Sequence, residues 1–370
     1  MKSVVWSVVL IVCSIVSGGA SAADARVATW NLMRLGNGAE KSYAAVAAIA
    51  ANVDIVAVQE VMNDKGLNDL KAALEARTKE SWSVLASDPA GSRAYQESYG
   101  FVYRDSAIEY VEGAVSYLDR KNIFMRPPFS ALFKSKNGAA TDVFALSTVH
   151  IIYGKSAADR TPELAELGNY WTWLEQVYPG AKLMLMGDFN MPPTDDAFVD
   201  LKQHAMPLIT SGASTLSATD GRYANLYDQV WVSKANPPKI TSAGIVDYPK
   251  MIGWSHEKSR QHVSDHAPVM FQLGSAQLAS TVQFVRPESG AKMAKFKNSL
   301  KAANQPLYAT TAEPSARSAA GPVRGNQSSH VYHRATGCPF YDRISAKNRV
   351  EFESEAAAQA QGYRLAGNCN

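Results

Sequence analysis

The sequence predicts an α/β fold, in which helices lie outside β-sheets, followed by a linker and a small terminal α+β module. Apolar runs typical of strands alternate with amphipathic helical stretches up to Ser275. No dinucleotide-binding glycine motif follows any of those strands. After Ser275 the composition shifts to Ala, Ser, Pro and Lys. Strands and helices mixed along one segment are typical of sheets covered by helices.

The expected elements follow from hydrophobic periodicity. Apolar runs predict strands at 26–31, 54–60, 99–104, 129–133, 142–150, 182–186, 227–232 and 267–273. Helical spacing predicts helices at 40–52, 67–77 and 162–177. The last of these helices carries Trp171, Trp173 and Leu174 on its apolar side. We therefore expect one large domain at residues 23–275.

The segment 1–22 is typical of a cleaved export signal. Lys2 precedes an apolar run from Val4 to Val16, and the small residues Ala-Ser-Ala follow at 20–22. The run is shorter than the roughly 20 apolar residues that span a bilayer. No other stretch of the sequence is long and apolar enough for a membrane helix. We therefore expect an exported protein, extracellular or periplasmic, that does not insert into a membrane.

The cysteines place thiol chemistry outside the large domain. Cys13 belongs to the expected signal, so the mature chain keeps only Cys338 and Cys369. A lone pair of cysteines in an exported protein most often forms a disulfide. A bridge that closes a loop of about 30 residues would stabilise a small module by roughly 3 kcal/mol. Cysteine catalysis in residues 23–275 is excluded, because that segment has no cysteine.

The C-terminal part carries the positive charge. Residues 276–370 hold 12 Lys and Arg against 6 Asp and Glu, a net charge of +6, whereas the whole chain has +3. We expect a basic Ala/Ser/Pro-rich linker at 276–325 and a compact module at 326–370. A basic tail favours a polyanionic partner, although a solvated linker would have the same composition.

Two motifs combine oxygen ligands with histidine beside expected strands. Gly187-Asp188-Phe189-Asn190 follows the strand at 182–186, and Ser264-Asp265-His266 precedes the last strand. Carboxylate and amide oxygens suit Mg²⁺, Mn²⁺ or Ca²⁺ better than zinc. A divalent ion beside histidines is a usual means of hydrolysing a phosphate ester. The chain also contains Thr29-Trp30-Asn31-Leu32, Gln59-Glu60, Tyr95, Glu97, Arg126, Thr148-Val149-His150 and Tyr227-Asp228.

This ordered set resembles the endonuclease/exonuclease/phosphatase superfamily, and within it the secreted deoxyribonuclease I-type enzymes. The resemblance covers residues 26–273 and rests on several short motifs in the family's order. It implies a two-sheet sandwich flanked by helices, with the active site at one edge. It also implies a divalent metal, with Mg²⁺ expected and Mn²⁺ or Ca²⁺ as alternatives.

The resemblance assigns roles to individual residues. The expected acid and base are His150 and His266, with Glu97 and Asp228 as their orienting carboxylates. Which histidine donates the proton stays open. The expected metal ligands are Glu60, Asp188 and Asp265. The expected substrate contacts are Asn31, Tyr95, Arg126 and Asn190. Taken singly, the Asn and Asp residues after strands could equally be turn residues.

Two departures from these patterns have consequences. The family's nucleases often carry an arginine two residues after the catalytic glutamate, and Met62 here removes that contact with the DNA minor groove. The terminal module resembles the small metal-binding domain of the bacterial alkylation-repair methyltransferase, which binds zinc through four cysteines. Only Cys338 and Cys369 remain here, with His333 as a third candidate ligand, so zinc is not expected.

We expect a secreted, metal-dependent endonuclease that hydrolyses DNA and leaves a 3′-hydroxyl, as members of the family do. RNA is a further candidate substrate, and the sequence gives no sign of an obligate protein partner. Two alternatives stay open. One is a secreted phosphodiesterase of the same superfamily that acts on lipid headgroups. The other is a non-catalytic DNA-binding protein.

Overall fold

The computed structural model describes residues 24–37, 40–137, 143–285, 323–327, 331–335 and 348–366, and the single residues 338, 341, 344 and 369. The chain forms two compact units, Met1–Gln305 and Pro306–Asn370. The expected export signal lies outside the described residues, and so does the expected linker between residues 286 and 322.

The first unit contains a sandwich of two mixed sheets. The first sheet runs in the spatial order β12 (Ile240–Ile245), β13 (Val269–Leu273), β1 (Ala25–Leu35), β2 (Ile55–Val61), β5 (Tyr95–Arg104) and β3 (Trp82–Ala86), with β4 (Ala90–Ser92) also paired to β5. The second sheet runs in the order β10 (Ala205–Pro207), β11 (Asp228–Ser233), β9 (Lys182–Asp188), β8 (Val143–His150), β7 (Phe129–Ser135) and β6 (Ile108–Ser116). The predicted sandwich is confirmed.

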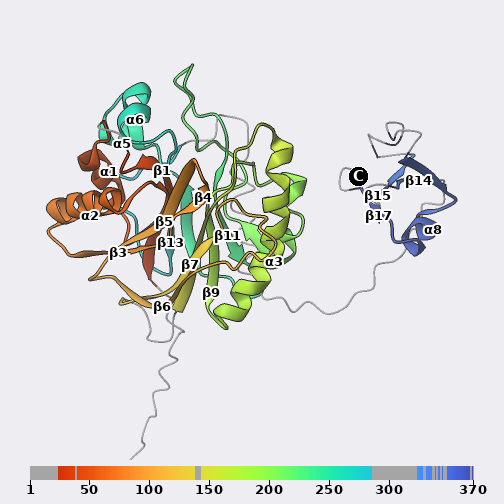
Figure 1. Cartoon of the computed structure of the whole chain (residues 1–370), viewed down its shortest axis with the longest axis horizontal. Helices are drawn as coiled ribbons and strands as arrows, with labels where there is room; N and C mark the ends of the chain where they lie inside the picture. Colours follow the sequence, from red (N-terminus) through yellow and green to blue (C-terminus); the bar gives the residue numbers. More distant parts are fainter. Residues whose placement is uncertain are drawn as a thin grey trace, which may run out of the picture. The chain divides into compact units, whose positions relative to one another are not determined.

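Helices cover the outer faces of the sandwich. They are α1 (Tyr43–Ala50), α2 (Asp64–Thr78), α3 (Thr161–Val177), α4 (Leu201–His204), α5 (Tyr248–Ile252) and α6 (His256–His262), with 3₁₀ turns η1 (Ala157–Asp159) and η2 (Asp196–Phe198). Figure 1 shows α1, α2, α5 and α6 on one side of the strands and α3 on the other. None of the helices in the described ranges combines the length and hydropathy needed to cross a bilayer.

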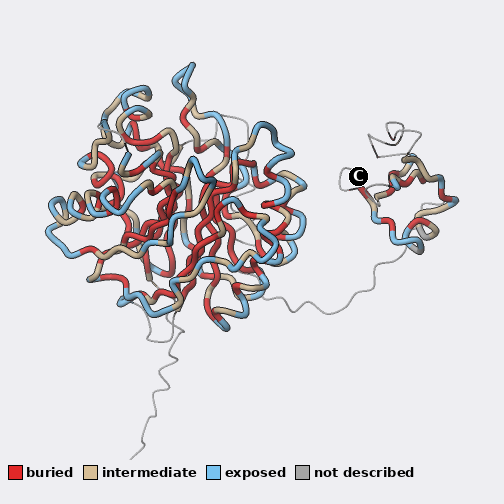
Figure 2. Tube along the Cα trace, in the orientation of Figure 1, coloured by how far each residue is buried: buried red, intermediate tan, exposed pale blue. Residues whose placement is uncertain are grey.

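Strand β9 shows why the second sheet is apolar on both faces. Met184 and Met186 belong to the core that both sheets share, whereas Leu183 and Leu185 pack with α3 on the outer face. Successive side chains of a strand point to opposite faces, so an uninterrupted apolar run fits a sheet that is buried on both sides. Figure 2 shows the strands largely buried between more exposed helices and loops.

Helix α3 packs through one apolar stripe. Its buried apolar side chains recur three or four positions apart and are Leu164, Leu167, Tyr170, Trp171 and Leu174. Pro162 lies in the first turn, where its missing N–H would have no helical partner. The helix is thereby fixed against the second sheet, and its first turn lies beside the strand ends that carry the site.

Several elements are not predicted by the sequence pattern, among them β6, α5 and α6. Strand β6 forms the edge of its sheet and most of its side chains are at least partly exposed, so it lacks the apolar alternation of a half-buried strand. Helices α5 and α6 have 5 and 7 residues, which is too short for a helical period to stand out. These elements depend on tertiary contacts rather than on local pattern.

The large domain continues beyond its expected boundary at Ser275. Phe284 packs on the main core and forms a bridge with Val246, and Val285 N–H donates to Ile245 O. A Cβ at Gly244 would lie 2.5 Å from the Phe284 ring, so this glycine makes room for it. The expected boundary lies too early, because residues 276–285 form no helix or strand whose periodicity would mark them as part of the domain.

The second unit is a small α+β module. Its elements are β14 (Val323–Asn326), β15 (Val331–Arg334), β16 (Arg349–Phe352), β17 (Arg364–Leu365) and α8 (Glu355–Ala360), with the strands in the order β16-β14-β15-β17. Its core includes Val323, which the sequence assigned to the linker. Cys338 and Cys369 are joined by a disulfide, and His333 Nδ1 lies 3.8 Å from Cys369 Sγ.

Candidate active site

The strand registers bring polar residues to one edge of the sandwich. The parallel strands β8 and β9 place His150 beside Asp188. Strand β11 runs antiparallel to β9, so its first residue, Asp228, pairs with Asp188. In the first sheet, the parallel strands β1 and β2 place Asn31 beside Gln59. Main-chain pairing therefore assembles residues that are far apart in the sequence.

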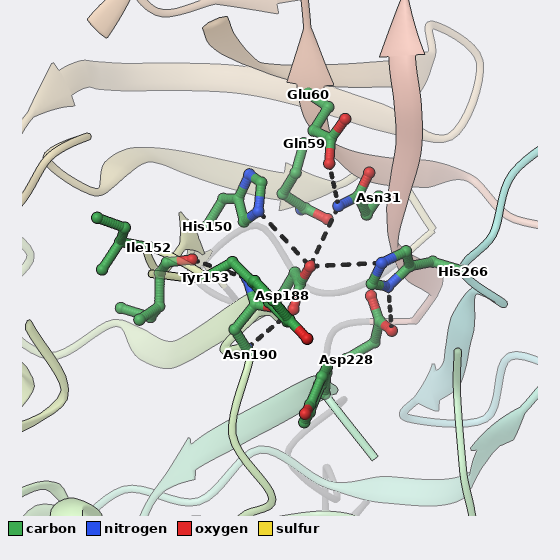
Figure 3. Close-up of polar contacts among 12 residues, drawn as sticks. Asn31, Gln59, Glu60, His150, Ile152, Tyr153, Asp188, Asn190, Asp228 and His266 are labelled. Carbon is green, nitrogen blue, oxygen red and sulfur yellow. Dashed lines mark hydrogen bonds and ion pairs between the residues drawn. The ribbon is translucent and has the colours of Figure 1, made fainter. Parts of the chain in front are cut away.

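Asp188 lies at the centre of the site (Figure 3). Its carboxylate is buried and accepts hydrogen bonds from Asn190 N at 2.9 Å and from Asn31 Nδ2 at 3.1 Å. The Nε2 atoms of His150 and His266 each lie 3.6 Å from Asp188 Oδ2. Burial opposes ionisation of Asp188, but the two histidines and the hydrogen bonds hold its pKa below the usual value.

Gly187 lets β9 approach β8 closely enough for this arrangement. Its φ is +141°, and a Cβ at this position would lie 2.0 Å from Val149 O. No side chain fits in that space, so glycine is required where Asp188 leaves the strand.

His150 is oriented by a carboxylate that it shares with an arginine. His150 Nδ1 lies 2.6 Å from Glu97 Oε1, and the same oxygen lies 3.3 Å from Arg126 Nε. Burial disfavours protonated His150, yet the charge of Glu97 raises its pKa above the ordinary value. Burial also opposes ionisation of Glu97, but His150 and Arg126 lower its pKa. With Nδ1 fixed, Nε2 of His150 faces Asp188.

His266 is oriented by a different kind of carboxylate. His266 Nδ1 lies 2.8 Å from Asp228 Oδ2, which also accepts a hydrogen bond from Ser214 Oγ at 2.6 Å. Burial raises the pKa of Asp228. Burial disfavours protonated His266 as well, but Asp228 and Asp188 raise the pKa of His266 well above the ordinary value. Nε2 of His266 faces the same carboxylate as Nε2 of His150.

Asn31 connects two carboxylates of the site through its amide nitrogen. Its Nδ2 donates to Glu60 Oε1 at 3.0 Å and to Asp188 Oδ2 at 3.1 Å, and its Oδ1 accepts from Met33 N at 2.9 Å. The side chain is buried and lines neither cavity of the site. The substrate contact of Asn31 stays a prediction, and its amide nitrogen is engaged in hydrogen bonds within the protein.

Several site residues have left-handed backbone. They are Met33 with φ of +42°, Arg34 with +56°, Glu60 with +57° and Asn190 with +50°. This region costs a residue with a Cβ about 1 kcal/mol or more. Side-chain oxygens of Asn31 and Asp188 accept from the main chain two residues later and support two of these turns. Asn31 and Asp188 are therefore turn residues, as the alternative interpretation expected, and their functional roles stay predictions.

Arg126 contributes to both the wall and the scaffold of the site. The residue is buried, and its Nε and Nη2 donate to His150 O at 3.2 and 3.0 Å. This edge of the guanidinium is occupied by the protein. The predicted substrate contact of Arg126 would therefore use the end of the guanidinium that is formed by the two Nη atoms.

Two adjoining cavities open at the site. The catalytic cavity, of about 500 Å³, is lined by residues that include Arg126, His150, Tyr153, Asp188, Asn190 and His266. The side cavity, of about 540 Å³, is lined by residues that include Met33, Arg34, Asn37 and Lys41. Both cavities include Glu60, Tyr95 and Asp265 in their walls. The two cavities therefore form a two-lobed groove with these three residues at the junction.

The donor set fits a hard divalent cation, although less tightly than predicted. Glu60, Asp188 and Asp265 offer carboxylate oxygens, the ligand type such cations prefer. Within the described part of this unit, the His, Cys, Asp and Glu group whose ligand atoms all lie within 4.8 Å of one another is Asp188, Asp228 and His266. Glu60 and Asp265 are outside that group. The predicted convergence of three carboxylates on one point is therefore looser in the structure.

Asp265 has a cationic neighbour that the sequence did not single out. Arg260 Nη2 lies 3.3 Å from Asp265 Oδ2, and Arg260 Nε donates to Leu216 O at 3.1 Å. Both Arg260 and Asp265 line the catalytic cavity. The carboxylate of Asp265 is thus held at the cavity wall by an ion pair.

Glu163 is a second residue that sequence reasoning missed. Its carboxylate accepts from Met125 N at 2.8 Å and from Ile152 N at 2.9 Å. These are the main-chain segments beside Arg126 and His150. The residue belongs to the first turn of α3, so one helix end holds two loops of the site. The sequence carries no signal for this role, because the partners are main-chain atoms.

Comparison with known proteins identifies similar sequences. The sequence profile of the Endonuclease/Exonuclease/phosphatase family matches residues 28–266. A deoxyribonuclease of Thioalkalivibrio sp. (strain K90mix) is 44% identical over 282 residues, which cover 73% of this chain and 77% of that protein. The deoxyribonuclease-1-like 1 protein of Rattus norvegicus is 27% identical over 237 residues, which cover 62% of this chain and 73% of that protein.

Solved structures agree with the fold. The crystal structure of ANGEL2, a 2′,3′-cyclic phosphatase, covers 68% of this chain and 95% of its own, with a TM-score of 0.51 and 11% identity. The structure of a functionally unknown protein from Enterococcus faecalis V583 covers 67% of this chain and 99% of its own, with a TM-score of 0.50 and 14% identity. At such identities the likeness concerns the fold alone.

Proposed function

Because this chain belongs to the endonuclease/exonuclease/phosphatase family, we propose that it is an exported, metal-dependent endonuclease that hydrolyses phosphodiester bonds of DNA. One observation carries the proposal: two histidine–carboxylate pairs direct their Nε2 atoms at Asp188. DNA as the substrate class is supported by the relatives from Thioalkalivibrio and rat, both of which are deoxyribonucleases by name.

The two histidines supply the proton transfers. Hydrolysis needs a base that takes a proton from the attacking water and an acid that gives one to the leaving O3′. His150 and His266 suit these tasks because each Nδ1 is fixed by a carboxylate and each Nε2 faces one point beside Asp188. Protonation of O3′ leaves a 3′-hydroxyl on one fragment and a 5′-phosphate on the other.

Other residues bind and orient the phosphate. Arg126 and Asn190 both line the catalytic cavity. Asn190 Nδ2 donates to Ile151 O at 2.8 Å, which fixes the amide and leaves its oxygen for a polar substrate group. Tyr95 lies at the junction of the two cavities, where a sugar next to the phosphate would pass.

A divalent cation is part of the proposal. Glu60, Asp188 and Asp265 would hold it, with Mg²⁺ expected, and a bound cation would neutralise charge that builds on the phosphoryl oxygens. Asn31 keeps Glu60 and Asp188 together through its amide nitrogen.

Plasmid cleavage tests the proposal against its rivals. The mature chain is incubated with supercoiled plasmid, RNA, sphingomyelin vesicles or phosphoinositide vesicles, each with Mg²⁺ or with EDTA. We expect nicked plasmid with Mg²⁺ and intact plasmid with EDTA. His204→Ala, a histidine variant outside the site, should cleave like the wild type. Lipid hydrolysis without nicking would instead support a lipid phosphodiesterase, and plasmid binding without nicking a non-catalytic DNA-binding protein.

The basic tail is proposed to hold DNA through counterion release. Residues 286–370 contain 12 Lys and Arg, so deleting them should reduce the slope of log Kd against log salt. Fluorescence anisotropy with labelled DNA measures that slope, and an equal slope for both chains would contradict this role. The likeness of the module to a metal-binding domain stays a prediction.

Export is the remaining part of the proposal. The expected signal at 1–22 motivates it. Expression in a bacterial host, followed by fractionation and N-terminal sequencing, should recover a chain that begins at Ala23 outside the cytoplasm. A full-length chain that stays in the cytoplasm would contradict it.

A further inference from the structure

We propose that Tyr153 is a substrate contact that stacks on an unpaired nucleobase next to the scissile phosphate. The inference rests on the proposed nuclease function and adds a binding subsite to it. Tyr153 lies just after β8, lines the catalytic cavity, and is 61% exposed. Buried aromatic rings stabilise a fold through their large apolar surface. An exposed ring at a cavity wall forgoes most of that stabilisation.

A buried arginine holds Tyr153 in place. Arg160 Cζ lies over the Tyr153 ring, 4.4 Å from its centre. Arg160 Nε donates to Tyr153 O at 2.8 Å, so the main chain and the ring are fixed by one guanidinium. Arg160 itself is only 7% exposed. A ring that is ordered before binding loses little conformational freedom when a ligand stacks on it.

The same arginine connects Tyr153 to the rest of the cavity wall. Arg160 Nη1 donates to Asn190 O at 2.6 Å, and its Cζ lies 5.7 Å from the centre of the Tyr227 ring. Asn190, Tyr153 and Tyr227 all line the catalytic cavity. Arg160 therefore supports three neighbouring parts of this wall, and Tyr153 is the most exposed of them.

The two cavities place Tyr153 relative to Tyr95. Tyr95 lies at the junction of both cavities, whereas Tyr153 lines only the catalytic cavity, together with His150 and His266. The two tyrosines therefore occupy different parts of the two-lobed groove. A strand whose phosphate lies beside the histidines would meet Tyr95 with one nucleotide and Tyr153 with the other.

A nucleobase is the ligand that this ring fits best. Every base offers a flat π face, and stacking on an aromatic side chain does not depend on sequence. One face of the Tyr153 ring is covered by Arg160, and the rest of the ring is exposed. Bases in an intact duplex are already stacked on each other. The subsite therefore favours single-stranded or locally unwound DNA.

Steady-state kinetics with three substrates test the inference. The substrates are a single-stranded oligonucleotide, the same strand with abasic residues, and the matching duplex. Tyr153→Ala should raise KM on the base-bearing single strand at least about fivefold, the lower limit for losing one stacked base. kcat should not change, because the contact binds ground state and transition state alike. On the abasic strand and on the duplex the variant should match the wild type.

Two variants separate the aromatic face from other effects. Tyr153→Phe keeps the ring and should keep the wild-type KM. Tyr153→Leu keeps apolar bulk over Arg160 but has no π face, and should share the raised KM of Tyr153→Ala. If the alanine variant proves unstable, the KM of Tyr153→Leu tests the stacking subsite in its place. Leu118→Ala is the matched control, because Leu118 is 65% exposed and is not part of the cavity wall.

The outcomes distinguish this inference from the proposed function. A wild type that cleaves no nucleic acid with Mg²⁺ would refute the nuclease function itself. A wild type that cleaves DNA, with an unchanged KM for Tyr153→Ala on the base-bearing strand, would refute only the stacking subsite. An equal rise in KM on base-bearing and abasic strands would also overturn it, because the contact would then not be with a base.

Discussion

The two histidines of the site have similar surroundings but differently shared carboxylates. Glu97, the partner of His150, also lies 3.3 Å from Arg126 Nε and so faces two cationic groups. Asp228, the partner of His266, faces one imidazole and one hydroxyl. Burial alone would raise the pKa of Glu97, but His150 and Arg126 outweigh this effect and lower it. Burial dominates at Asp228, so the pKa of that carboxylate is raised.

From this difference we expect the Glu97–His150 pair to affect both substrate affinity and turnover, and the Asp228–His266 pair to affect turnover alone. Arg126 donates to His150 O and lines the catalytic cavity, so Glu97 couples the position of His150 to that of the arginine. The carboxylate of Asp228, by contrast, pairs with Ser214 Oγ and His266 Nδ1, neither of which belongs to a substrate-facing arginine. Loss of Glu97 should therefore affect substrate affinity and turnover, and loss of Asp228 turnover alone.

Removing either histidine gives the largest expected effect and tests whether the two divide their roles. His150→Ala and His266→Ala should each lower kcat/KM on DNA by about a thousandfold, within the range for a general acid or base. A p-nitrophenyl phosphodiester of thymidine has a leaving group that needs no proton. On this substrate only the variant that lacks the general acid should regain activity close to that of the wild type, as measured by release of p-nitrophenolate. Recovery of both variants, or of neither, would contradict a division of roles.

Glu97→Gln should have the next largest effect. We expect kcat/KM to fall about a hundredfold, at the upper end for loss of a residue that orients a catalytic group, with KM raised and kcat lowered. Saturation kinetics on DNA separate the two parameters. An effect on kcat alone would contradict the proposed coupling to Arg126. Glu109→Gln, an exposed glutamate on β6, is the matched control.

The same variant gives a signed pH prediction. His150 faces Glu97, Arg126 and Asp188, and the charge of Glu97 is the main cause that raises its pKa. Removing this charge lowers the pKa of His150. The limb of the kcat/KM profile that belongs to His150 should therefore move to lower pH, whether the histidine acts as acid or as base. A limb that moves to higher pH, or does not move, would contradict this account.

Asp228→Asn should have a smaller effect, confined to kcat. We expect kcat to fall about tenfold, at the lower end for an orienting partner, with KM unchanged. The amide keeps the shape of the carboxylate but not its charge, so His266 is held less firmly in one tautomer. Saturation kinetics on DNA give both parameters, and a raised KM would show that this pair also controls substrate affinity.

Ser214→Ala should have the smallest effect. Ser214 Oγ donates to Asp228 Oδ2 at 2.6 Å, and its loss should lower kcat about fivefold, the equivalent of one hydrogen bond of about 1 kcal/mol. Because the hydroxyl acts through Asp228, the change should add nothing in an Asp228→Asn background. A double-mutant cycle measures this coupling, and additive effects would place Ser214 outside the pair.

The residues at the ends of strands could be predicted from the sequence. His150 and Asp188 each follow an apolar run, and the order of the motifs along the chain limited what they could do together. The sandwich was implied by the resemblance to the family, because periodicity alone predicted only an α/β fold. The positions of the strand ends depend on local pattern and on side-chain chemistry, both of which the sequence carries directly.

The supports of the site could not be predicted. Arg160 and Glu163 act on main-chain atoms of other loops, and such partners leave no trace in residue type. The role of Asn31 depended on which of its amide atoms faces the carboxylates, and only the fold decides this. The end of the large domain was misplaced because residues 276–285 have no helix or strand periodicity, and Phe284 contacts the core only through the fold, beside Gly244.

The left-handed backbone at Glu60 has a consequence for how this protein could be improved in the laboratory. Glycine adopts a φ of +57° without steric cost, so Glu60→Gly relieves strain at that position. The relief is opposed by the loss of two hydrogen bonds, because the Glu60 carboxylate accepts from Asn31 Nδ2 and from Arg34 N. A screen for heat resistance should therefore retain Glu60, since its removal would take an acceptor from the buried Asn31 amide.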